Sequence, residues 1–371
     1  MALARREAGV DLDDADVREP LSRLLASLNS ESRLHQEGAV AMREKIVRNL
    51  ANRLRMQRDF AAHPEIAEQP LQAPLIICGM ARTGSTKTQK LLASSGDFNW
   101  LPYWQVFNPS LLSGDRRESP QPRIDDCDRF ARWFDAASPA NKAAHPFSTH
   151  EPEEESFILE HSLKSPVLMG WAPMPGYLTW LLSTEMSAQF TLLRNTLKYL
   201  QWQGLARPDR PWVLKSPLYS GLEPLLLAAF PDARLLMTHR TPVQTIPSGL
   251  QVLRCFYKPF TDAEPDPRFY VQGQAGAIAQ HLTNRAALPS GTFLDLHFRD
   301  INHATADVIG RIYEFAGLPL RGEPMQRMQR WTQENPQHRF GRHEYSLEMF
   351  GLDEASIRAQ FAGYLELVDS V

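Results

Sequence analysis

Cysteine is scarce in this chain of 371 residues. Only Cys78, Cys127 and Cys255 occur, and they are widely spaced. An odd number of separated cysteines argues against a disulfide framework, and the sequence has no C-x-x-C pair that would indicate a thiolate metal site. A reducing cytoplasm is therefore the predicted compartment.

Long apolar runs and an excess of one charge are also missing. No run approaches the roughly 20 apolar residues that cross a bilayer, and the opening "MALARREAGVDLDDADVREP" carries acids where a signal peptide needs an apolar core. With 40 basic and 43 acidic residues the formal charge is -3, which excludes a general nucleic-acid binder. We expect a globular protein without a membrane span, in which any anion site is a local cluster.

Helical periodicity is present over residues 16–58, where apolar residues recur at three- and four-residue steps among many charges. This pattern predicts an N-terminal helical extension, residues 1–70, that acts as scaffolding or as a homodimer contact. Residues 71–371 are predicted to form one α/β domain.

Short apolar runs alternate with helical patterns after the extension, which predicts a three-layer fold with a central parallel sheet, like that of P-loop NTPases. Residues 125–203 show helical patterns and no strand, so we predict an insertion covering the carboxyl edge of the sheet, where such folds bind ligands. The predicted strands are 75–78, 212–215, 233–239 and 292–298, and the predicted helices between them are 220–230, 242–257, 268–287 and 304–316.

The stretch "GMARTGST", residues 79–86, nearly spells the phosphate loop G-x-x-x-x-G-K-[ST] between the first strand and a helix beginning at Ser85. Its lysine is missing, and Arg82 supplies a cation within the loop instead. Lys87 comes one residue too late, and the strand 233–239 leads into Arg240 rather than into an acid that would organise Mg²⁺. A turn with two glycines at a helix N-terminus lets backbone N–H groups approach one anion. The residues predicted to bind it are Gly79, Arg82, Thr83, Gly84, Ser85 and Thr86.

Three blocks of the chain, spanning residues 71–368, resemble sulfotransferases. "RTGST" after a strand is similar to the 5′-phosphosulfate loop of that family. "WVLKSPLYSGLEPLLLAAFPDARLLMTHRTPVQTIPS", residues 212–248, resembles the 3′-phosphate segment, in which a strand-end arginine, here Arg240, precedes a serine, here Ser248, by eight residues. "NPQHRFGRHEYSLEMFGLD", residues 335–353, is similar to the C-terminal loop that closes over the nucleotide in bacterial members.

This resemblance implies 3′-phosphoadenosine 5′-phosphosulfate (PAPS) as co-substrate and adenosine 3′,5′-bisphosphate (PAP) as product. Two phosphate sites are then expected, with Arg240 and Ser248 at the second one. The transferred sulfuryl group bears one negative charge, so no metal is expected. Arg82 and Lys215 are the implied catalytic cations. The tail is expected to add the nucleotide-binding residues Arg339, Gly341 and Arg342.

The general base is expected in "HPFSTHEPEEESFIL", residues 145–159, which resembles an acid-rich motif of bacterial relatives. Some relatives use a histidine and others a glutamate. Glu151 precedes Pro152 and is therefore predicted at a helix N-terminus, where the dipole favours the ionised carboxylate. Glu154 is preferred slightly over Glu151, with His150 as the rival.

Aromatic residues concentrate in the stretches 99–107, 133–134 and 170–182. As a group they predict a site for a small hydrophobic or aromatic alcohol. "TFLDLHFRDI" departs from the acidic stretch of the family after this strand, because it carries His297, Phe298 and Arg299.

Two alternatives remain open from the sequence. One is a P-loop kinase that uses Lys87 and Mg-ATP, and the other is an inactive nucleotide-binding scaffold that kept the loops and lost the base. The sulfotransferase interpretation requires Arg240 to lie close to residues 79–86.

Overall fold

The computed structural model describes residues 1–12, 14–112, 115, 119–336 and 345–370. The chain divides into two compact units. The first contains Met1–Leu71, Leu101–Pro208 and Leu253–Pro265, and the second contains Gln72–Trp100, Asp209–Val252 and Asp266–Val371. The extension, domain and insertion boundaries expected from the sequence stay predictions.

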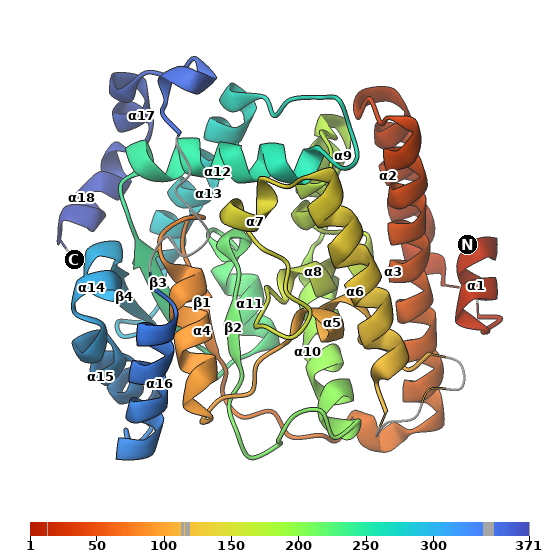
Figure 1. Cartoon of the computed structure of the whole chain (residues 1–371), viewed down its shortest axis with the longest axis horizontal. Coiled ribbons are helices and arrows are strands. Elements are labelled where there is room, and N and C mark those ends of the chain that lie inside the picture. Colours follow the sequence, from red (N-terminus) through yellow and green to blue (C-terminus); the bar gives the residue numbers. More distant parts are fainter. Residues whose placement is uncertain (13, 113–114, 116–118, 337–344, 371) are drawn as a thin grey trace. The chain divides into compact units, whose positions relative to one another are not determined.

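Four parallel strands form the sheet of the second unit (Figure 1). They are β1 (Leu75–Cys78), β2 (Val213–Lys215), β3 (Arg234–His239) and β4 (Phe293–His297). Their order across the sheet is β2-β1-β3-β4, so both neighbours of the central strand β1 arrive later in the chain. All four strands were predicted, and the parallel α/β fold class is confirmed.

Both faces of the strand β1 are buried, as is typical of a parallel sheet. Leu75 and Ile77 of β1 belong to an apolar core with residues of α4 (Ser85–Ser95), α14 (Phe298–His303), α15 (Thr305–Ala316) and α16 (Gly322–Glu334). Ile76, which points to the opposite face because side chains alternate along a strand, is equally buried. The ends of β1 are therefore held firmly, which positions the turn that follows it.

The four helices predicted between the strands are observed as α11 (Glu223–Ala229), α12 (Pro242–Tyr257), α13 (Pro267–Ala287) and α15, with each end within three residues of the prediction. The helices α14, α16, α17 (Glu354–Gln360) and α18 (Ala362–Ser370) were not predicted.

Helices build the first unit, and residues 125–203, all of them described, contain no strand. The single helical pattern of residues 16–58 corresponds to two helices, α2 (Arg18–Glu31) and α3 (Gln36–Ala62), because the chain turns before His35. The His35 imidazole caps the helix α3 by accepting a hydrogen bond from the Gly38 N–H at 2.9 Å. The other helices are α1 (Ala2–Ala8), α5 (Tyr103–Phe107), α6 (Gln121–Ala137), α7 (Asn141–Ala144), α8 (Ser156–Leu159), α9 (Pro175–Leu182) and α10 (Ser187–Trp202).

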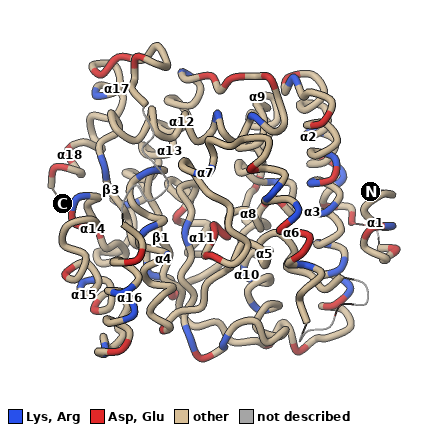
Figure 2. The backbone as a smooth tube through the Cα atoms, viewed as in Figure 1, with Lys and Arg blue, Asp and Glu red and all other residues tan. Residues whose placement is uncertain are grey.

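Charged residues of both signs are interspersed along the helices, as Figure 2 shows for α2 and α3. None of the helices in the described ranges combines the length and the apolar character that a bilayer-crossing segment needs.

Candidate active site

A glycine turn connects β1 to α4. Gly79 has a φ of 122° and Gly84 a φ of 94°, values that residues with a side chain rarely adopt. A Cβ on Gly79 would lie 2.4 Å from the carbonyl oxygen of Thr238 in β3, so only glycine allows this close approach. Gly84 provides no side-chain cap for α4. The first N–H groups of α4 therefore remain available to an anion, at the positive end of the helix dipole.

The three hydroxyl side chains predicted in this loop lie in different environments. Thr83 is fully buried, and its hydroxyl oxygen lies 2.7 Å from that of Thr238. Ser85 is also buried, whereas Thr86 is exposed. The Thr83 side chain thus anchors the loop to β3, which leaves its backbone N–H as its means of contacting a ligand.

Arg82 joins the loop to two predicted residues that are distant in sequence. Its Nε donates to Ser248 Oγ at 3.0 Å, and its carbonyl oxygen accepts from Arg240 Nη1 at 3.2 Å. Arg82 has a positive φ of 73°, which is unusual for a residue other than glycine. Burial lowers the pKa of the Arg82 guanidinium; Tyr345 opposes this shift and Arg240 adds to it. The structure therefore brings together the two segments that the sequence assigned to two phosphate sites.

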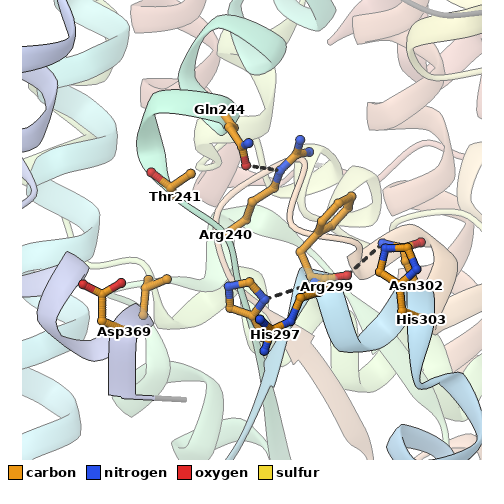
Figure 3. A pocket seen from close by; sticks show the side chains of 10 residues that line it. Arg240, Thr241, Gln244, His297, Arg299, Asn302, His303 and Asp369 are labelled. Carbon is orange, nitrogen blue, oxygen red and sulfur yellow. Dashed lines mark hydrogen bonds between the residues drawn. The ribbon is translucent and has the colours of Figure 1, made fainter.

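Arg240 follows β3 and lines an open hollow of about 470 Å³ (Figure 3). Its Nε donates to Gln244 Oε1 at 3.0 Å, one turn along α12, and its guanidinium lies 4.1 Å from the centre of the Phe298 ring. Basic groups predominate around the hollow, whose lining residues are Arg240, Thr241, Gln244, His297, Phe298, Arg299, Asn302, His303, Val368 and Asp369. The guanidinium groups of Arg240 and Arg299 suit a phosphate.

His297 and Arg299, where the sequence departs from the related acidic stretch, lie at the start of α14. His297 Nδ1 accepts from the Arg299 N–H at 3.0 Å, an interaction drawn in Figure 3. Gln244 and Asn302, which line the same hollow as Arg240, were not predicted from the sequence. The four-residue spacing from Arg240 could have indicated Gln244, because residues four apart are neighbours on a helix. Asn302 had no such local signal, since it is brought to the hollow by the pairing of β4 with β3.

Lys87, the cation of the kinase alternative, is occupied elsewhere. Its Nζ donates to the Ile301 carbonyl oxygen at 2.9 Å and to Asn302 Oδ1 at 3.2 Å, and burial lowers its pKa. The ammonium therefore ties α4 to α14.

Lys215 ends β2 on the same sheet edge as the loop. It pairs with Ile77 in the parallel register, two residues before Gly79, and only 1% of it is exposed. The next residue, Ser216, continues the ladder by donating its N–H to the Ile77 carbonyl oxygen at 3.1 Å. The catalytic role expected for Lys215 stays a prediction.

The candidate bases belong to the first unit. His150 and Glu151 are exposed, and Glu154 is half-buried, with the Ser156 hydroxyl donating to its Oε2 at 3.4 Å. The predicted helix position of Glu151 is wrong. The nearest helix, α8, begins at Ser156, because Pro152 pairs instead with Pro102 in an isolated bridge that keeps the intervening chain extended.

The same segment contains a histidine–carboxylate pair that the sequence analysis missed. His145 Nε2 lies 3.1 and 3.2 Å from the two carboxylate oxygens of Glu153. Residues eight apart lie about 12 Å apart in a helix and about 26 Å apart in a strand. Their side chains cannot meet within either element, so no local signal announced the pair.

Most aromatic residues of the expected acceptor site form a packed cluster within the first unit. Trp171 stacks on Phe256 with ring centres 5.4 Å apart, and Phe134 meets Phe147 edge-on at 5.0 Å. Phe134 and Trp171 are buried, whereas Trp133 is half-buried. Their role towards an acceptor stays a prediction.

Arg339, Gly341 and Arg342 lie outside the described residues. Within the described ranges no group of three or more His, Cys, Asp or Glu residues is placed to hold a metal ion. None of the three cysteines, all of which lie in the described ranges, forms a disulfide, and all three are buried.

Comparisons with known proteins show the family and the fold of the chain. A family model described as the sulfotransferase family matches residues 74–322. The chain resembles the crystal structure of sulfotransferase STF9 from Mycobacterium avium with a TM-score of 0.86 and 26% sequence identity, over 99% of this chain and 95% of that chain. Sulfotransferase STF1 from Mycobacterium tuberculosis H37Rv shares the fold, with a TM-score of 0.78 and 23% identity, over 98% of this chain and 97% of that one. A search among curated proteins found no match.

Proposed function

Because this chain belongs to the sulfotransferase family, we propose that it transfers the sulfuryl group of PAPS to the hydroxyl of a small hydrophobic or aromatic acceptor. The chain is a sulfotransferase by family and by fold, and the proposal concerns its donor and its acceptor. One observation carries the donor: Arg82 bonds to Ser248 through its side chain and to Arg240 through its carbonyl oxygen.

PAPS carries two separate anionic groups, and the second unit offers two sets of donors. The turn at residues 79–86 and the positive end of α4 suit the 5′-phosphosulfate. Arg240 and Ser248 suit the 3′-phosphate, because the planar guanidinium can form a bidentate contact with two phosphate oxygens. This second contact would distinguish PAPS from ATP, which lacks a 3′-phosphate.

Arg82 and Lys215 are the proposed catalytic cations. As the acceptor oxygen bonds to sulfur, the bond from sulfur to the bridging phosphate oxygen breaks, and the electron pair stays on that oxygen. A cation near this oxygen stabilises the transition state more than the ground state. Because the sulfuryl group carries a single negative charge, direct in-line displacement with two protein cations suffices.

The acceptor hydroxyl loses its proton during transfer, so a base is needed. We propose that the segment of residues 145–159 supplies it. The candidates for this base from the sequence stay Glu154, Glu151 and His150. The candidates for nucleotide binding in the tail stay Arg339, Gly341 and Arg342. The cytoplasmic location and the homodimer through the N-terminal helices also stay predictions.

Calorimetric titration with PAP and with Mg-ATP tests the donor. We expect PAP to bind at least 100-fold more tightly, and Lys87→Met to leave its affinity within about threefold, because this ammonium bonds to α14. Tight binding of Mg-ATP without binding of PAP, abolished by Lys87→Met, would establish the kinase alternative.

Turnover is tested with radiolabelled PAPS and a panel of phenols, sterols, fatty alcohols and glycans. We expect transfer to members with an aromatic or apolar body. Tight PAP binding with no transfer to any acceptor would support the inactive scaffold.

A further inference from the structure

We propose that His145, oriented by Glu153, is the general base that accepts the proton of the acceptor hydroxyl. This inference rests on the proposed function, because it assigns one role within the same transfer. It differs from the three candidates that the sequence suggested.

The pair is held from several sides. The Glu153 carboxylate accepts from the Glu154 N–H at 2.8 Å, while its backbone N–H donates to the Leu101 carbonyl oxygen at 2.9 Å. The backbone of His145 is fixed at both ends, since its N–H donates to the Asn141 carbonyl oxygen at 2.8 Å and its carbonyl oxygen accepts from Asn141 Nδ2 at 2.7 Å. The imidazole therefore has little freedom to turn.

Aromatic rings fix the plane of the imidazole. Phe147 and Phe256 meet it edge-on, with ring centres 5.3 and 5.4 Å away. The side chains of His145 and Glu153 are 15% and 7% exposed, so the pair is shielded without being sealed from solvent. In such surroundings the carboxylate stabilises a developing imidazolium more strongly than it would in water.

The geometry determines which nitrogen can act. An ionised carboxylate only accepts hydrogen bonds, so the nitrogen that faces both of its oxygens, Nε2, carries the proton. Nδ1 then has a free lone pair: it bonds to none of the described residues and is not among the buried polar atoms that lack a partner. In other enzymes, nucleophiles are activated by a base that a third group orients. His145 has this arrangement, because the carboxylate of Glu153 orients Nε2 and leaves Nδ1 to accept a proton.

Of the sequence candidates, the rival histidine His150 lacks this support. His150 and Glu151 are exposed, and no histidine–carboxylate bond orients His150 among the described residues. Glu154 uses its backbone N–H to orient Glu153. It therefore fits better as part of the scaffold of the pair.

The acceptor O–H proton passes to His145 Nδ1 as the oxygen bonds to sulfur, and the electron pair of the sulfur–oxygen bond that breaks stays on the departing PAP. The imidazolium beside Glu153 then releases the proton to solvent.

The test measures kcat against pH at saturating PAPS, with any acceptor from the panel that the wild-type enzyme sulfates. We expect His145→Gln to lower kcat by about 10²- to 10⁴-fold, to abolish the acid limb of the profile, and to keep PAP affinity within about twofold. Adding imidazole to His145→Ala should restore part of kcat. Glu153→Gln should also lower kcat, because the imidazole loses the carboxylate that orients it.

His63→Gln is the matched control, because His63 Nδ1 also faces a carboxylate, that of Glu65 at 3.2 Å, but with 42% of its side chain exposed. We expect this variant to keep the wild-type profile. The proposal is overturned if His145→Gln retains at least half of the wild-type kcat. It is also overturned if imidazole restores none of the kcat that His145→Ala has lost, because His145 would then have a structural role. An inactive wild-type enzyme that binds PAP would instead count against the proposed function.

Discussion

Arg240 is the residue on which recognition of the donor depends most directly. Its guanidinium holds the carbonyl oxygen of Arg82, rests on the Phe298 ring and reaches Gln244, all through a planar group with five donors. A lysine could supply the charge but not the fork.

We therefore predict that Arg240→Lys weakens PAP binding by about 10- to 100-fold, the range expected for loss of a charged hydrogen bond. Isothermal titration calorimetry measures the change. Arg358→Lys, in an exposed pair with Glu354 on α17, is the control and should bind PAP as the wild type does. Equal affinity of Arg240→Lys and the wild type would contradict the assignment of the 3′-phosphate to Arg240.

At the scale of elements, β4 is tied to its neighbours through Asp295. Its carboxylate accepts from His239 Nε2 of β3 at 2.8 Å and from Arg285 Nη1 of α13 at 2.9 Å. Tyr364 of α18 extends the network, because its hydroxyl lies 3.2 Å from His239 Nδ1. This network holds the end of β3, immediately before Arg240.

The network predicts a dependence of stability on pH. Burial acts to raise the pKa of Asp295, but the hydrogen bonds from His239 and Arg285 outweigh it and hold the pKa at about 2. Because this is below the value of about 3.9 for an unfolded chain, the carboxylate stabilises the fold by about 2 kcal/mol above pH 4. This contribution is lost as the pH falls through 2.

We expect Asp295→Asn to lower the free energy of unfolding at pH 7 by about 2 kcal/mol, with the difference shrinking as the pH approaches 2. Urea unfolding between pH 7 and pH 3 measures it. Asp307→Asn, at an exposed position in the first turn of α15, should change the free energy by no more than about 0.5 kcal/mol. A constant difference across the pH range would refute the linkage to ionisation.

At the scale of the whole molecule, the predicted functions divide between the two units. The phosphate loop, Lys215, Arg240 and Ser248 belong to the second unit, whereas the acid-rich segment and the aromatic cluster belong to the first. We therefore expect donor binding to change the second unit more than the first.

Hydrogen exchange with and without PAP tests this division. We predict slower exchange in residues 79–95 and 240–252, where the ligand would order the turn and the start of α12. Exchange in α1 should stay unchanged. Protection confined to the first unit would contradict the donor site.

Much of the second unit was readable from sequence because its determinants are local. The apolar run of β1, the glycines of the turn and the start of α4 at Ser85 are set by backbone preferences of adjacent residues. The eight-residue spacing from Arg240 to Ser248 placed both around the start of α12 for the same reason.

The sequence by itself thus determined the four strands, the helices α4, α11, α12, α13 and α15, and the family resemblance. Tertiary structure alone decided that Arg82 bonds to Ser248, that Lys87 bonds to α14, and that His145 pairs with Glu153. It also overturned the helix position of Glu151. The physical reason is that backbone conformation follows from neighbouring residues, whereas the partner of a polar side chain depends on which distant segments pack against it and on the requirement that buried polar groups be hydrogen-bonded.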